Sequence, residues 1–353
     1  MTNKPIRSCI IAVEGLSLSA DEVHLLSKYN PIGVSIFARN VKDKIQLKKL
    51  VDDIKNVIGR DDVLIAVDQE GGRVRRLAEP SWRPYASQMT LGKVAAEASN
   101  HHAELISRDL REIGVNLNYA PVLDVRIENT TLALKSRCFS DDKDKVVELG
   151  RIMVDEYIRN GICPCLKHMP GTGGAVVDSH LQLPVIDLSL EEMQKDFYPF
   201  RVLNYAPCGM TGHFLVPWLD DKYPITQSKK AIDALIRGEI GFDGFLISDA
   251  LDMRALQGSF GDKVRVSLEA GCDATCMYSA NMQDLIDVCE NSQILSDKSL
   301  NRFEKIKKVF KNKLLDQDWD NVSSKYDSII GPVETYSDEY DATEVLKKMK
   351  HKG

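Results

Sequence analysis

The sequence of 353 residues lacks any run approaching the ~20 apolar residues that a membrane-spanning helix needs. Lys4 and Arg7 precede an apolar run at 9–13, but that run is too short for the core of a signal peptide. An excess of positive charge is also missing, since the formal net charge is -6, whereas a general nucleic-acid binder carries a basic footprint. We therefore expect a protein that neither inserts into a membrane nor binds nucleic acid.

The eight cysteines lack the spacing of zinc sites and of disulfide-rich scaffolds. Cys163 and Cys165 alternate on a predicted strand, and Cys272 and Cys276 do not form a CxxC pair. The glycine pair at 71–72 does not follow the dinucleotide-binding spacing either. We therefore expect buried free thiols in a reducing cytoplasm, no metal ion and no organic cofactor.

What the chain does have is a short apolar run followed by a helix-like segment, repeated eight times. Uninterrupted apolar strands are typical of a parallel sheet that is buried on both faces. Eight such units predict a (β/α)8 TIM-type barrel, and a doubly wound open sheet is the alternative. The predicted strands are 10–13, 32–37, 63–67, 115–120, 162–166, 208–211, 245–248 and 274–278.

Helix signals support the same organisation. Ser19 with Glu22, and Ser189 with Glu192, form predicted capping boxes at the starts of two helices. No second core is evident after the eighth unit. We therefore assign residues 1–315 to one catalytic domain, and residues 316–353 to a helical or irregular C-terminal extension that is not a separate domain.

Polar residues fall at or just after the carboxyl ends of the predicted strands. In a barrel these ends converge on one face, which carries the active site, whereas an open sheet would spread some of them apart. The residues are Asp68, Asp124, Lys167, His168, His213 and Asp249.

The segment KHMPGTGGAVVDSH holds Asp178 and His180, which stand two residues apart and can meet only on a loop or a strand. A carboxylate beside an imidazole fixes its tautomer and favours its protonated form, as a general acid requires near neutrality. We hypothesise a proton-transfer pair whose partner is Asp249. A surface DxH segment in a mobile loop, and a helix N-cap at Asp249, remain open as alternatives.

A third cluster, AVDQEGGRVRRL, joins Asp68 to a glycine pair and three arginines, which suit sugar hydroxyls and an anionic group. Ordinary surface arginines around a turn are the alternative. Glu70 in this segment can be mistaken for a catalytic acid. Arg137 alone is a weak signal, whereas Lys167 and His168 are adjacent titratable groups at a strand end. A core histidine stays possible for His168 and also for His213.

With these segments in order, the chain resembles family 3 glycoside hydrolases. Within that family it is most similar to the bacterial cytoplasmic β-N-acetylglucosaminidases (β-hexosaminidases) of peptidoglycan recycling. Several motifs in register across residues 10–310 are far more specific than any one of them. They are IGVSIFARN, AVDQEGGRV, NLNYAPVLDV, SRCFSDD, KHMPGTGG, VDSH and GFDGFLISDALDM.

The resemblance implies a (β/α)8 barrel and a retaining exo-hydrolase that acts through a covalent glycosyl-enzyme on terminal non-reducing N-acetylglucosamine of muropeptides. It implies that Asp249 is the nucleophile and that His180, assisted by Asp178, is the general acid/base. We expect a cytoplasmic monomer whose partner is this small oligosaccharide. The residues that match sugar-holding positions are Asp68, Arg76, Arg137, Lys167 and His168.

Two positions depart from the family pattern. Thr172 stands where the family usually has a histidine, and Ala250 where relatives commonly carry a second aspartate. The first bears on the loop that positions His180, and the glycines around Thr172 suggest that this loop moves. Two other functions stay open: a phosphorylase, because a histidine repels phosphate less than a carboxylate would, and a non-catalytic sugar-binding protein.

Overall fold

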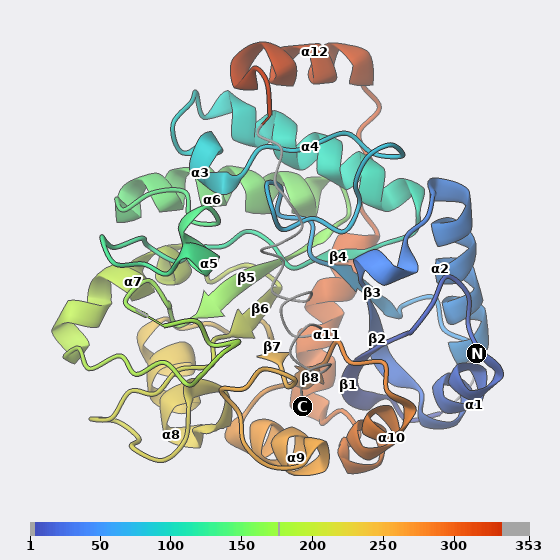
Figure 1. Cartoon of the computed structure of the whole chain (residues 1–353), viewed down its shortest axis with the longest axis vertical. Coiled ribbons are helices and arrows are strands. Elements are labelled where there is room, and N and C mark those ends of the chain that lie inside the picture. The colour runs from blue at the N-terminus through green and yellow to red at the C-terminus, as the bar shows by residue number, and fades with distance from the viewer. Residues whose placement is uncertain (1–3, 176, 334–353) are drawn as a thin grey trace.

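A computed structural model describes residues 4–175 and 177–333 and contains one closed barrel of eight parallel strands (Figure 1). The first and last strands pair at Cys9 with Thr275 and at Ile10 with Cys276, so the predicted (β/α)8 barrel is confirmed and the open-sheet alternative is wrong. The strands are β1 (Arg7–Ala12), β2 (Pro31–Ile36), β3 (Leu64–Val67), β4 (Leu117–Asn118), β5 (Cys163–Met169), β6 (Cys208–Thr211), β7 (Phe245–Ala250) and β8 (Ala274–Cys276).

Helices surround the barrel (Figure 1). Both predicted capping boxes are present, at Ser19 with Glu22 and at Ser189 with Glu192. The main helices are α1 (Ala20–Tyr29), α2 (Lys44–Ile58), α4 (Glu97–Glu112), α6 (Lys143–Arg159), α7 (Leu190–Val202), α9 (Phe260–Ala270), α10 (Met282–Asn291), α11 (Asp297–Phe310) and α12 (Trp319–Ile330). The shorter ones are η1 (Ala38–Asn40), α3 (Gln88–Leu91), α5 (Leu132–Lys135), η2 (Ile225–Gln227) and α8 (Lys229–Ala231), which continues into the π-helical η3 (Ile232–Glu239).

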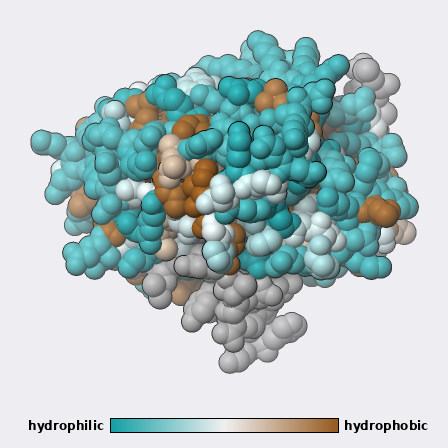
Figure 2. Space-filling view, turned by 90° about the horizontal axis from the view of Figure 1, so that it is seen from above, coloured by the Kyte–Doolittle hydropathy of each residue, from teal (hydrophilic) through white to brown (hydrophobic). Residues whose placement is uncertain are grey.

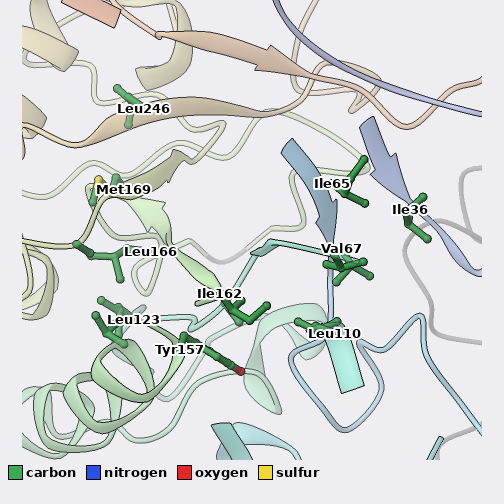
Figure 3. Close-up of a cluster of buried hydrophobic side chains, with 14 of the residues drawn as sticks. Ile36, Ile65, Val67, Leu110, Leu123, Tyr157, Ile162, Leu166, Met169 and Leu246 are labelled. Carbon is green, nitrogen blue, oxygen red and sulfur yellow. The ribbon is translucent and has the colours of Figure 1, made fainter. Parts of the chain in front are cut away.

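Each strand divides its side chains between two buried layers. Leu64 and Ala66 of β3 lie in the barrel interior, while Ile65 and Val67 lie in the layer between barrel and helices, part of which Figure 3 shows. Successive side chains of a strand point to opposite faces of the sheet. Because both faces of β3 are buried, this strand has no polar residue. The larger side chains of this strand, Leu64, Ile65 and Val67, each stabilise the fold by roughly 1.5–3 kcal/mol on burial.

Helix α11 closes the amino-terminal end of the barrel. Phe303 and Ile306 join the interior cluster, and Arg302 pairs with Asp243 and Asp273, which precede β7 and β8. The sequence spacing predicts an apolar stripe of Leu300, Phe303, Ile306 and Val309 on this helix. The prediction is wrong at Leu300, because that side chain is 38% exposed. With this end covered, the carboxyl ends of the strands are left for a site.

Two of the predicted boundaries that differ from the structure belong to the fourth strand and to the helix after Arg137. The fourth strand was expected over 115–120, but β4 spans only two residues, and side-chain oxygens of Asn116 and Asn118 accept further hydrogen bonds from the backbone of Ile65 and Gln69. The segment after Arg137 predicts a helix capped near Ser140, whereas Asp142 caps that helix, α6, in the structure. Both differences are local and leave the order of elements unchanged.

The predicted extension contains one packed helix, because α12 lies on the outside of α4 with Val322 and Tyr326 buried (Figure 1). Residues 334–353 of that extension lie outside the described residues. The face in Figure 2 is mostly hydrophilic, with apolar residues in small groups. In the described ranges, no helix is both long enough and apolar enough to span a membrane.

Candidate active site

The carboxyl ends of the strands enclose a cavity, hereafter the site cavity, with an empty volume of about 730 Å³ including solvent at its mouth. A second hollow of about 470 Å³ shares Arg137, His168, His180 and Asp249 with it and is also lined by Asp178. All eight residues predicted as catalytic or sugar-holding therefore line one or both of these two hollows. Those lining the site cavity are Asp68, Arg76, Arg137, Lys167, His168, His180 and Asp249.

Asp249 lies near the end of β7, where one of its oxygens accepts a hydrogen bond from the Ala250 backbone N–H at 2.7 Å. It does not cap the next helix, since Ser259 caps α9, and the N-cap alternative is wrong. Burial raises the pKa of the Asp249 carboxyl, but nearby histidines, His168 foremost, outweigh burial and hold this pKa below its ordinary value. Asp249 is thus an ionised carboxylate at neutral pH.

His180 and Asp178 form the expected pair on the loop between β5 and α7. Nδ1 of His180 lies 2.7 Å from Oδ1 of Asp178, and the His180 backbone N–H donates to the same oxygen at 3.0 Å. Burial raises the pKa of Asp178, but the hydrogen bond from His180 outweighs it, and this pKa lies below its ordinary value. The carboxylate therefore fixes a proton on Nδ1 and leaves Nε2 for exchange with a ligand.

Five charged side chains form a paired network along one side of the site cavity. The Lys167 ammonium lies 2.8 Å from Asp68 and 2.6 Å from Glu70. Arg137 donates two hydrogen bonds to Glu70, from Nε at 2.9 Å and from Nη2 at 2.8 Å. Arg76 also donates to Asp68, at 3.2 Å, and is only 8% exposed, so surface arginines are the wrong interpretation there. Paired in this way, the charges avoid the cost of lone buried ions.

The pairing keeps these groups ionised over the neutral range. Burial favours the neutral form of Glu70, but Arg137 and Lys167 lower the pKa of its carboxyl to about 2. Burial likewise lowers the pKa of Lys167, and the carboxylates of Asp68 and Glu70 more than compensate, leaving it above its ordinary value. Charged donors and acceptors in a fixed arrangement can hold the hydroxyl groups of a sugar.

His168 is held by Asp124, a residue that the sequence placed at a strand end but not in the site. Asp124 Oδ2 lies 2.7 Å from Nδ1 of His168, while Oδ1 accepts the Thr172 backbone N–H at 2.7 Å. One carboxylate thereby orients a cavity side chain and the start of the His180 loop. His213 is buried and hydrogen-bonded to Thr226 and to the Ala250 carbonyl, and it lines the second hollow beside Asp249.

Comparison with known proteins identifies the family. The model of the glycosyl hydrolase family 3 N-terminal domain matches residues 9–309. The chain belongs to this family. A β-hexosaminidase of Pseudomonas aeruginosa is 32% identical over 275 residues, which cover 75% of this chain and 80% of that protein.

Other relatives extend the likeness. β-Hexosaminidase A of Pseudoalteromonas piscicida is 28% identical over 87% of this chain, and the chain spans only 58% of the length of that protein. The crystal structure of NagZ from Neisseria gonorrhoeae in complex with N-trifluoroacetyl-D-glucosamine matches with a TM-score of 0.83 at 26% identity, over 94% of this chain and 100% of that one. The predicted family is confirmed, and the chain is a glycoside hydrolase of the β-hexosaminidase group.

Two functional groups of this family 3 hydrolase escaped the sequence reasoning. Glu70 is not a free acid but the carboxylate that joins Arg137 to Lys167, and Asp124 is the support of His168. Their position after predicted strands was the only available signal. Thr172 is the position where the resemblance leads us to expect a histidine. Its methyl carbon would lie 2.7 Å from a Cβ added at Gly212, so this position is tightly packed.

A further buried carboxyl, Asp196 of α7, lies beneath the start of the His180 loop and is only 4% exposed. A Cβ at Gly173 would lie 3.0 Å from its Oδ1. Burial and the neighbouring Asp124 carboxylate raise the pKa of Asp196 to about 7. The folded protein therefore retains a proton that the unfolded chain loses near pH 4, so the free energy of unfolding should fall as the pH rises from about 4 through 7.

Asp196→Asn removes this dependence. With an ordinary pKa near 4 and a pKa of about 7 in the folded protein, at ~1.4 kcal/mol for each tenfold change in proton affinity, the contribution of Asp196 to this dependence has an upper limit of about 4 kcal/mol. The free energy of unfolding of variant and parent can be measured with urea at pH 5 and at pH 8. The difference, variant minus parent, should be at least about 1 kcal/mol larger at pH 8 than at pH 5. Asp187→Asn, at an exposed carboxylate of the same region, is the control and should show no such gain. If variant and parent differed in free energy of unfolding by the same amount at both pH values, Asp196 would not have a raised pKa in the folded protein.

Proposed function

We propose that this family 3 hydrolase is a retaining exo-β-N-acetylglucosaminidase that removes terminal non-reducing N-acetylglucosamine from muropeptides. The observation that carries the proposal is that Asp249 and His180 line both hollows, with Asp178 paired to His180 and with the charged groups of Asp68 and Lys167 on the site cavity. A retaining hydrolase needs a nucleophile at the anomeric carbon and an acid at the leaving oxygen. The resemblance to enzymes of peptidoglycan recycling supports the muropeptide as substrate.

In the first step, Asp249 attacks the anomeric carbon while protonated His180 donates its Nε2 proton to the departing oxygen. Asp178 stays ionised and stabilises the imidazolium. The products of this step are a covalent glycosyl-enzyme on Asp249 and the free aglycone. The sugar is held during it by the predicted binding set of Asp68, Arg76, Arg137, Lys167 and His168.

In the second step, neutral His180 takes a proton from a water molecule, which attacks the anomeric carbon and releases Asp249. Two inversions at the same carbon give a product with retained configuration. The histidine thus acts as acid and then as base, in agreement with microscopic reversibility. We further propose that the enzyme works as a cytoplasmic monomer, which light scattering of the purified chain would test.

The N-acetyl preference can be measured by hydrolysis of an aryl β-N-acetylglucosaminide beside the matching β-glucoside. We expect a ratio of kcat/KM of about 10²-fold or more in favour of the N-acetyl sugar, because a site built for a polar group discriminates strongly against its loss. Equal rates would refute the specificity. The same assay with inorganic phosphate tests the phosphorylase alternative, since only a phosphorylase yields the sugar 1-phosphate, and absence of all turnover would favour a binding protein.

A further inference from the structure

Helix α12 lies outside the residues 9–309 that match the family. One of its side chains is nevertheless connected by hydrogen bonds to the backbone of Glu70, next to the site. Tyr326 is fully buried, and its hydroxyl accepts the backbone N–H of Ala86 at 2.9 Å. The same hydroxyl lies 3.2 Å from Nδ1 of His102 on α4. Arg83 adds a second link, through hydrogen bonds to Ser323 and Asp327 of the helix.

His102 continues the connection, since its Nε2 lies 3.0 Å from the backbone carbonyl oxygen of Glu70. A carbonyl can only accept, so Nε2 carries the proton. Burial lowers the pKa of His102 to about 4, which leaves the ring neutral, with Nδ1 as an acceptor. The hydroxyl of Tyr326 therefore donates to Nδ1, and the hydrogen bonds run in one direction from α12 to Glu70.

The receiving segment is a tight turn at Glu70, Gly71 and Gly72. Both glycines have positive φ, +101° and +60°. A Cβ at Gly71 would lie 2.2 Å from the Ala86 carbonyl oxygen and 2.9 Å from Cε1 of His102. The turn is thus enclosed between α4 and the segment that Tyr326 holds. It carries the Glu70 carboxylate, which is the shared partner of Arg137 and Lys167.

We propose that Tyr326 and His102 are positioning residues that fix the Glu70 turn, so that the C-terminal helix α12 sets the geometry of the charged groups that hold the sugar. Neither side chain touches the site cavity. Their effect passes through the backbone of Glu70 to the Arg137 guanidinium and the Lys167 ammonium. The inference rests on the proposed function, in which those two cations bind the sugar.

Tyr326→Phe tests the proposal, because it removes one hydroxyl and keeps the ring. We expect a KM for an aryl β-N-acetylglucosaminide about tenfold higher, with kcat changed less than threefold, since a misplaced binding group weakens ground state and transition state alike. His102→Ala should do the same. His102→Gln should recover part of the loss, because its amide N–H can donate to the Glu70 carbonyl.

Val322→Ala is the matched control, as this buried side chain lies on the same helix and has no polar link to Glu70. It should lower Tm at least as much as Tyr326→Phe while leaving KM unchanged. A folded Tyr326→Phe protein with unaltered KM would overturn the proposal. So would an equal rise of KM in both variants, which would show that docking of the helix alone matters.

Hydrogen exchange provides a readout that does not depend on turnover. The amide of Gly72 donates to the Tyr85 carbonyl at 2.8 Å, and it should exchange faster in Tyr326→Phe but not in Val322→Ala. If the parent protein showed no N-acetylglucosaminidase activity, the proposed function would fail while this experiment still judged the positioning role. Unchanged exchange at residues 70–77 would contradict that role whatever the activity.

Discussion

Replacement of Asp249 by alanine is expected to lower turnover of every β-N-acetylglucosaminide by about 10⁴-fold or more, the order seen when a covalent nucleophile is lost. The buried carboxylate is held ionised by the surrounding histidines, so it is ready to attack an anomeric carbon. Steady-state kinetics with an activated aryl glycoside and with a disaccharide would measure the loss. Both substrates should be affected, because both need the nucleophile.

Asp243→Asn is a fitting control for this variant. Asp243 precedes the same strand at the opposite end of the barrel, where it pairs with Arg302 and Lys305. Its loss removes a carboxylate from the chain without touching the cavity, and activity should persist. Retention of more than about one percent of activity by Asp249→Ala would place the nucleophile elsewhere.

The second large effect is expected from His180→Ala, and it should depend on the leaving group. A disaccharide has a poor leaving group and needs the acid, so kcat/KM should fall by about 10²–10⁴-fold. The aryl group of an activated aryl glycoside leaves without protonation, so kcat/KM for that substrate should fall by less than about tenfold. Measuring kcat/KM is essential here, because this ratio reports formation of the glycosyl-enzyme and not its hydrolysis.

Leu181→Ala separates the imidazole from the loop that carries it. Leu181 follows His180 and is 45% exposed, so its truncation disturbs the same loop without removing a proton donor. Both substrates should keep kcat/KM near the parent value in this control. A His180→Ala protein that lost the same factor on both kinds of glycoside would argue that the histidine serves binding and not proton transfer.

Much of the fold follows from local signals in the sequence. Apolar and polar residues do not alternate along the predicted strands, because neighbours such as Leu64 and Ile65 are buried on opposite faces of the same strand. Burial of both faces is typical of a parallel sheet. Helix starts such as Ser19 with Glu22 depend on residues three positions apart and are equally legible. The short β4 was not predicted, because its limits depend on contacts that Asn116 makes across the sheet.

The site was predicted only where function leaves a local pattern. Asp178 and His180 are two positions apart, so their pairing could be anticipated. Glu70 meets Arg137 across 67 positions, and His102 meets Tyr326 across 224, so neither contact leaves a spacing in the sequence. The resemblance to family 3 supplied the roles of single residues, but the supports behind them come from the packed structure alone.

In the proposed mechanism Asp249 forms a covalent bond to the sugar and His180 serves both steps. The most direct test is to incubate His180→Ala with an activated aryl β-N-acetylglucosaminide, quench, digest and analyse the peptides by tandem mass spectrometry. Attack by Asp249 continues without the acid, but hydrolysis lacks its base, so an N-acetylhexosaminyl adduct should accumulate on Asp249. An adduct on another residue, or no adduct together with a product of inverted configuration, would contradict the mechanism.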